Sequence, residues 1–228
     1  MSLLDEIQDP EEAVRAARRV NGVAAGVVTD NRDPEGLARI KVRMPWLAAD
    51  AESHWVKVAT MYAGDNRGSV WLPEVDDEVL LAFEHGDIDH PYVIGALYNS
   101  TSKPPEANAD GRNDVKTIRT RSGHVLLFGD DARNGRERIE IRSKSGHRIE
   151  LSDATGSETV TISDKSGQNI LTLVSQNNHA TLKAGLKITL EAPQVEIKTQ
   201  RFSVTADATA SVEASGPLTL RGAVVNIN

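Results

Sequence analysis

The sequence contains no cysteine, and its 228 residues include only three Trp, three Tyr and three Phe. The lack of cysteine excludes disulfide bonds and thiolate metal sites. The scarcity of aromatic rings disfavours a single-stranded nucleic acid groove, where bases stack on exposed rings. Clustered positive charge is missing too, because the formal net charge is −7. Since phosphate binding needs gathered Lys and Arg side chains, we expect no nucleic acid partner.

Long apolar runs are also absent. No stretch approaches the ~18 consecutive apolar residues of a membrane-spanning helix. The first thirty residues lack the basic start and apolar core of a signal peptide. We therefore expect a chain that is made in the cytoplasm, and any export would have to use another machine.

The chain does contain a short repeat over its last fifty residues. Two apolar residues separated by one polar residue recur every seven or eight positions, with Gly, Pro, Ala, Ser and Thr between the pairs. Each pair places two side chains on one face of a short strand. Because such units have only one thin apolar face, they must stack, and a narrow rod of them needs other chains to close its core. The expected core positions are Leu182, Ile188, Leu190, Val195, Ile197, Phe202, Val204, Val212, Leu218, Leu220, Val225 and Ile227.

The rest of the chain divides into four segments. Residues 9–20 of an N-terminal arm (1–21) are predicted to be a short helix, because Asp9 can cap it, Pro10 suits its first position and Glu12 completes a capping box. Residues 99–114 are almost free of apolar side chains, which is typical of a linker. Between them, residues 22–98 are predicted to form a small Greek-key barrel of the OB type. Its expected strands are 23–29, 37–43, 54–60, 69–72, 78–83 and 92–97, which alternate in polarity between turn signals.

Residues 115–179 carry a longer repeat. RSGHVLLF at 121–128 recurs as KSGHRIEL at 144–151 and as KSGQNILT at 165–172. Each Ser-Gly lies between strand-like segments, which indicates successive hairpins or wide rungs that narrow to the short repeat at 180–228. The expected fold class is therefore all-β, apart from the short N-terminal helix.

Several motifs resemble one known family. The segments GVVTDNRDPEGLARIKVRMPWL at 26–47, WVKVA at 55–59, GSVWLPEVDDEVLLAFEHGD at 68–87 and PYVIGALYN at 91–99 are similar, in order and spacing, to the OB domain of VgrG proteins and of the central spike proteins of contractile phage tails. The Ser-Gly hairpins and the terminal repeat match as well. The resemblance covers residues 22–228, about nine-tenths of the chain.

This resemblance implies a homotrimer, in which three OB barrels surround a C-terminal intertwined β-helix that pierces a target envelope. The chain lacks the large N-terminal hub domain of VgrG and any lysozyme-like insertion, so it looks most like the phage baseplate assembly protein V. We then expect a separate hub or baseplate protein, indirect attachment to the tail tube and transient contact with the target membrane. The alternatives are a type VI secretion VgrG-like spike without a hub domain and a β-helical tail protein that binds or degrades polysaccharide.

The C-terminal end is expected to carry a partner. The last apolar pair lies one residue from the terminus, and no polar cap follows it. Exposed apolar side chains and unpaired strand edges are usually covered. In related spikes the cover is a small conical protein of the PAAR type, and its expected contacts here are Val225, Ile227 and Asn228.

Candidate chemical sites are few. The segment HGDIDH at 85–90 offers imidazoles and carboxylates, which could bind a metal, but we interpret it as a polar turn. His124 and His147 occupy equivalent repeat positions and share parity with apolar residues, so a trimer could gather them into rings of three imidazoles that hold an ion or water. A histidine that only packs beside the hairpin glycine is the simpler interpretation. The His-x-His iron site of some phage spikes does not carry over, because no histidine follows His179. We predict no catalytic constellation and no cofactor.

Overall fold

The structure is a computed structural model that describes residues 19–226. Its N-terminal sheet has the strand order β2-β1-β6-β7-β3. These strands are β1 (Val23–Asp30), β2 (Lys41–Arg43), β3 (Lys57–Val58), β6 (Glu78–Phe83) and β7 (Pro91–Leu97). Neighbours are antiparallel except β3 and β7, which are parallel. A bridge between Ile40 and Val56, with backbone N–H···O distances of 3.0 and 2.7 Å, joins the two ends of this order and closes the barrel.

Alternating apolar residues of these strands fill the barrel. Its core is Val28, Ile40, Val42, Met44, Val56, Val79, Leu81 and Val93. Gly26 on β1 lies so close to the next strand that an added Cβ would overlap with Cγ1 of Val42 and would lie 3.0 Å from Cδ1 of Leu81. The small hairpin of β4 (Ala63–Gly64) and β5 (Arg67–Gly68) is inserted between β3 and β6.

One expectation for this region is wrong, and another is contradicted only at its last two residues. Residues 69–72 form no strand, because Ser69 makes the only backbone bond there, donating its N–H to the Tyr62 carbonyl at 2.9 Å, and Pro73 follows. Most of the predicted helix at 9–20 lies outside the described residues. Its last two residues are extended: Arg19 forms a bridge with Asp87, and the Val20 N–H donates to the Gly86 carbonyl at 2.9 Å.

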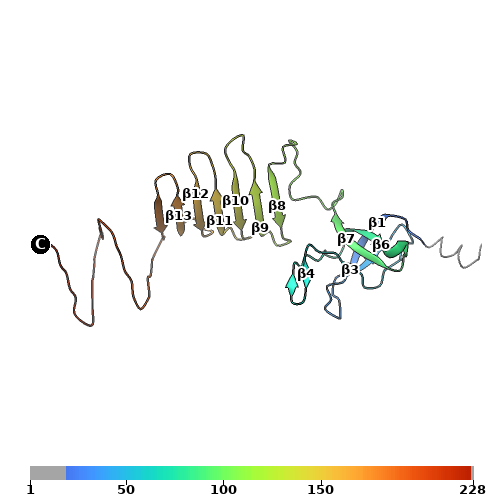
Figure 1. Ribbon diagram of the computed structural model, residues 1–228, viewed down its shortest axis with the longest axis horizontal. Helices are drawn as coiled ribbons and strands as arrows, with labels where there is room; N and C mark the ends of the chain where they lie inside the picture. Colours follow the sequence, from blue (N-terminus) through green and yellow to red (C-terminus); the bar gives the residue numbers. More distant parts are fainter. Residues whose placement is uncertain (1–18, 227–228) are drawn as a thin grey trace, which may run out of the picture. The chain divides into compact units, whose positions relative to one another are not determined.

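After residues 98–114, which contain no strand, the chain forms a seven-stranded antiparallel meander in which each strand pairs with its predecessor (Figure 1). Its strands are β8 (Val115–Arg119), β9 (Val125–Gly129), β10 (Arg138–Arg142), β11 (Arg148–Ser152), β12 (Thr159–Ser163), β13 (Ile170–Val174) and β14 (His179–Lys183). The repeated Ser-Gly motifs form the turns that precede β9, β11 and β13. The sheet thus extends to Lys183, four residues beyond the boundary expected at 179.

Residues 184–226 belong to a second compact unit. The short repeat was expected to form strands, but these residues contain none in the single chain. The reason is that a strand needs a partner for its backbone N–H and C=O groups, and narrow rungs of one chain cannot supply it. The intertwined β-helix therefore stays a prediction. Within residues 19–226, no helix has the length and apolar character needed to cross a membrane.

Candidate functional site

One face of the seven-stranded sheet is apolar and uncovered. Residues directly opposite in the strand register share a face, and the register aligns two rows of side chains across all seven strands. Most of these side chains are 37–58% exposed. An antiparallel sheet gains its stability by burying one face, so this face is built to meet a partner. The first row is Ile118, Leu126, Ile141, Ile149, Ile162, Leu171 and Leu182, and the second is Lys116, Phe128, Ile139, Leu151, Val160, Leu173 and Ala180.

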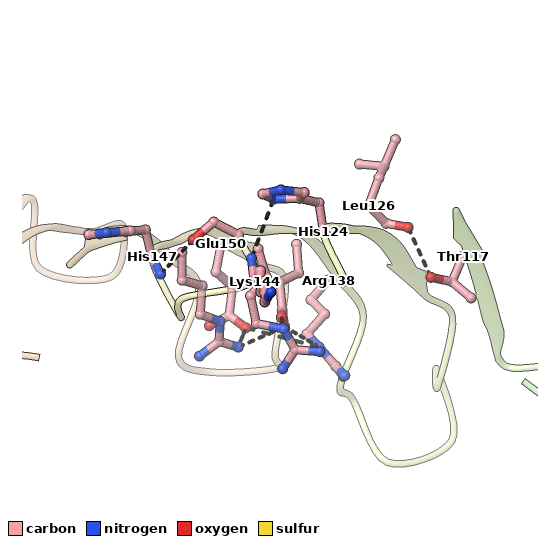
Figure 2. Close-up of polar contacts among 11 residues, drawn as sticks. Thr117, His124, Leu126, Arg138, Lys144, His147 and Glu150 are labelled. Carbon is pink, nitrogen blue, oxygen red and sulfur yellow. Dashed lines mark hydrogen bonds and ion pairs between the residues drawn. The ribbon is translucent and has the colours of Figure 1, made fainter. Parts of the chain in front are cut away.

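On the opposite face of the sheet, charged side chains of β10 and β11 pair with one another. Glu140 is only 4% exposed, and Nη2 of Arg148 donates to its Oε2 at 3.1 Å and also to Oε2 of Glu150. Nε of Arg142 lies 3.4 Å from Glu140 Oε1, and Nε of Arg138 lies 3.8 Å from Oε2. In Figure 2, Arg138 and Glu150 lie on one side of the sheet, and Leu126 lies on the other. Because these charged side chains pair with one another on β10 and β11, the apolar face is the better candidate for assembly.

The segment 184–226 repeats this pattern in extended form. Its described core positions are all exposed, between 49% and 74%. Each Val, Leu, Ile or Phe side chain that becomes fully buried contributes about 1.5–3 kcal/mol. An unpaired chain with so many exposed apolar side chains is expected to assemble with other chains. Ile227 and Asn228, two of the expected tip contacts, lie outside the described residues; the third, Val225, is exposed.

The sheet's apolar face was missing from the core predicted by sequence reasoning, which began at Leu182. The signal was present, since Ile139 and Ile141, or Ile149 and Leu151, alternate with charged residues along their strands. Leu182 belongs to this face, because β14 pairs with β13 and places it opposite Leu171. The candidate site therefore includes the apolar face of the sheet, from β8 to β14, in addition to the expected positions of the terminal repeat.

Both candidate histidines lie in tight turns and are exposed. His124 receives a hydrogen bond from the backbone N–H of Lys144 to its Nδ1 at 3.3 Å, which links two successive turns. The backbone N–H of His147 donates to Oγ of Ser143 at 3.0 Å. His124 lies on the same side of the sheet as Leu126 (Figure 2). The structure does not bring the two imidazoles together within one chain, so imidazole rings remain a prediction about the trimer.

The segment 85–90 is a turn that closes on itself. The N–H of Asp87 donates to the Glu84 carbonyl at 2.9 Å, and the N–H of His90 donates to the Asp87 carbonyl at 3.1 Å. Nδ1 of His90 lies 2.9 Å from the Asp87 carboxylate. Within residues 19–226, no group of three or more His, Asp or Glu side chains is placed to hold a metal ion. This arrangement agrees with the interpretation of a polar turn.

Comparison with known proteins identifies the barrel. Residues 24–98 match the family model of the type VI secretion system/phage-baseplate injector OB domain. The chain is 32% identical to the type VI secretion system spike protein VgrG3 of Vibrio cholerae over 120 residues, 48% of this chain and 11% of the relative. It is 26% identical to the spike protein VgrG1a of Pseudomonas aeruginosa over 147 residues, 60% of this chain and 22% of the relative.

A further relative, 29% identical over 116 residues, is the actin cross-linking toxin VgrG1 of Vibrio cholerae, of which the chain covers 10%. The chain thus spans between a tenth and about a fifth of the length of these three relatives. Residues 24–98 are thus an injector OB domain of the type VI secretion system/phage-baseplate kind, and over about half of its length the chain is similar to VgrG spike proteins.

Proposed function

We propose that this protein is the structural, non-enzymatic central spike of a contractile injection apparatus, and that it pierces the target envelope as a homotrimer. The observation that carries the proposal is the uncovered apolar face of β8–β14, together with the exposed apolar pairs of the terminal repeat, in a chain that contains an injector OB domain. Three copies would bury these positions around one axis. A thin, rigid rod of this kind suits a mechanical role.

The proposal includes partners at both ends. A separate hub or baseplate protein would seat the OB barrels and connect the spike to the tail tube. A PAAR-type protein would cover the C-terminal end around Val225, Ile227 and Asn228. This cover is supported by the apolar character of the last pair, since an open end would expose three copies of it.

A phage tail baseplate and a phage-tail-like injection particle are equally served by such a spike. A type VI secretion spike is the second candidate, favoured by the names of the relatives. A polysaccharide-degrading role has less support, because Phe128 is the only aromatic residue on the seven-stranded sheet.

The functional test uses contractile particles from a host in which the gene for this chain is deleted. We expect the central density below the baseplate and the ability to puncture target cells to be lost together, and to return when the wild-type chain is supplied. A complementing chain with Leu190→Asp should restore neither, whereas the neighbouring Thr189→Asp should restore both. Particles that keep a normal central density without this chain would contradict the proposal.

The tip protein is tested separately by co-expression of the chain with small neighbouring reading frames, followed by pull-down through the chain. We expect one small protein to be retained by the wild-type chain and lost from a chain that ends at residue 223. Density in the intact particle that ends at Asn228 would remove the tip protein from the account.

A further inference from the structure

The two rims of the seven-stranded sheet differ in charge. A rim is defined here as the strand ends and turns along one side of the meander. The Ser-Gly turns 120–124, 143–147 and 164–169 lie on one rim, and the other turns, 130–137, 153–158 and 175–178, lie on the opposite rim (Figure 1). Because the chain reverses at every strand, the two kinds of turn alternate between the rims, and each rim collects residues from distant parts of the sequence.

The rim of the Ser-Gly turns is basic. Its one carboxylate, Asp164, is engaged within its own turn: it accepts a hydrogen bond from Oγ of Ser166 at 2.7 Å and from the N–H of Asn169 at 3.2 Å. These bonds, chiefly the one from Ser166, lower the pKa of Asp164 to about 2. Arg121 pairs with Glu74, and Arg142 and Arg148 pair with Glu140. The cations of this basic rim are Arg119, Arg121, Arg142, Lys144, Arg148, Lys165 and Lys183.

The rim of the other turns has an excess of carboxylates. Its turn 153–158 carries Asp153 and Glu158 and no cation. Asp130 is paired with Lys116 at 2.6 Å, and Arg138 points to the Glu140 cluster. The anions of this acidic rim are Asp114, Asp130, Asp131, Glu137, Asp153 and Glu158, and its cations are Arg133, Arg136 and Arg138.

The two rims cannot neutralise each other within one chain. Five-residue strands separate them, a distance of about 16 Å at the usual rise per residue. Unpaired cations such as Lys144 and Lys165 therefore lie well beyond contact distance from Asp153 and Glu158 of the same copy. Their charges are left for another molecule.

Rotational symmetry brings unlike rims together. If three copies turn their apolar faces to a common axis, a rotation about that axis places one rim of each sheet beside the other rim of the next sheet, which is a heterologous contact. Turns on either rim recur once every two strands, or about 9.6 Å. The charged turns of the two rims share this period, so they can match from β8 to β12, whereas the last turn of the acidic rim, 175–178, carries no charge.

We infer that the basic rim of one copy docks against the acidic rim of the next copy, at each of the three corners of the assembly. This inference rests on the proposed trimer and adds its docking surface. Apolar burial drives assembly, while charge complementarity between the rims selects head-to-tail closure and the vertical register of the three sheets.

The first test is zero-length carbodiimide coupling of the wild-type protein, followed by mass spectrometry of peptides from the cross-linked dimer and trimer bands. We expect amide links from Lys144 or Lys165 to Glu137, Asp153 or Glu158. Because about 16 Å separates the rims within a chain, each such link must join two copies. A cross-linked trimer that contains no rim-to-rim link would overturn the inference.

The second test reverses the charges. Variant one carries Lys144→Glu, Lys165→Glu and Lys183→Glu, and variant two carries Glu137→Lys, Asp153→Lys and Glu158→Lys. At about 20 mM salt, each should raise the concentration needed for half-assembly at least tenfold, and about 500 mM salt should restore much of this loss, because salt screens exposed charges. The chain with all six changes should assemble like the wild type. A matched control with Lys57→Glu, Arg67→Glu and Lys103→Glu changes the net charge as variant one does and should assemble normally.

The outcomes separate the two proposals. A wild-type protein that is monomeric at both salt concentrations would overturn the trimer and the rim contact together. The rim contact alone would be overturned if the wild type is a trimer and both variants also assemble normally at low salt. It would likewise be overturned if the chain with all six changes assembles no better than variant one or variant two. Circular dichroism of each variant identifies loss of folding, and the cross-linking test does not depend on any variant.

Discussion

Asp33 organises the connection between β1 and β2 almost alone. Its carboxylate accepts hydrogen bonds from the N–H groups of Glu35, Leu37 and Arg39 at 3.0–3.2 Å, and it pairs with the Arg39 guanidinium at 2.8 and 2.9 Å. The side chain is only 3% exposed. The hydrogen bonds from the Arg39 side chain are the main cause that holds the pKa of Asp33 well below its usual range, and they raise the pKa of Arg39.

The depressed pKa gives a pH dependence with a definite sign. The folded state favours ionised Asp33, so its contribution is complete above the unfolded pKa of about 3.9 and is lost as the pH falls below that value. Asp33→Asn should therefore lower the thermal midpoint of the barrel at pH 7, and the difference from wild type should shrink below about pH 4. Calorimetry of both proteins between pH 3 and 7 checks this, and a constant difference over that range would refute it.

In the seven-stranded sheet, Glu140 is likewise a buried carboxylate with guanidinium partners. Three guanidinium groups lie near it, and removing a buried partner leaves such groups unpaired. Because these Arg side chains are 36–50% exposed, water offsets part of the loss, and Glu140→Ala should destabilise the sheet by about 1–3 kcal/mol. Urea unfolding measures this, with exposed Asp65→Ala as a control expected within about 0.5 kcal/mol of wild type. Equal effects of the two changes would show that the cluster does not stabilise the sheet.

At the scale of elements, alternation in the sequence predicted most of the strands. The segment 78–83 was predicted with the bounds of β6, and 92–97 differs from β7 by one residue. The segment 69–72 has the composition of a strand, but no other strand lies beside it to accept its backbone hydrogen bonds. Amino-acid composition alone does not determine whether such a partner strand is present. Likewise, the helix signals at 9–20 did not predict the contacts that draw Arg19 and Val20 into the barrel.

The short repeat makes a prediction at the same scale. Leu190→Asp or Leu220→Asp would bring three carboxylates to one axis, each desolvated and repelling the others. We expect either change to abolish assembly or to remove heat resistance in denaturing gels, since an intertwined rod resists unfolding kinetically. Thr189→Asp and Thr219→Asp add the same charge one residue away, on the opposite parity, and should be tolerated. Leucine variants as resistant as the wild type would place these side chains on the outside.

At the scale of the whole molecule, the sequence shows the apolar pairs of the terminal repeat, whose burial in a trimer stays a prediction, but it does not show the surfaces of the seven-stranded sheet. The seven- to eight-residue period is visible along the chain, whereas the basic and acidic rims exist only after the meander sorts its turns to two sides. The apolar face of the sheet was missed for a related reason. Each row of apolar side chains runs across the seven strands, so any one strand contributes only one residue to each of the two rows. The rows are therefore not visible along the sequence of a single strand.

The central claim is that three copies complete one structure, and the most direct test is the mass of the purified full-length protein in solution. Multi-angle light scattering across a dilution series should give a single species of about 74 kDa, three times the 24.7 kDa chain. It should persist to the lowest measurable concentration, with circular dichroism dominated by β-structure. A stable, folded species of 24.7 kDa would contradict the account, because the apolar positions from β8 to the terminal repeat would then remain exposed in a soluble protein.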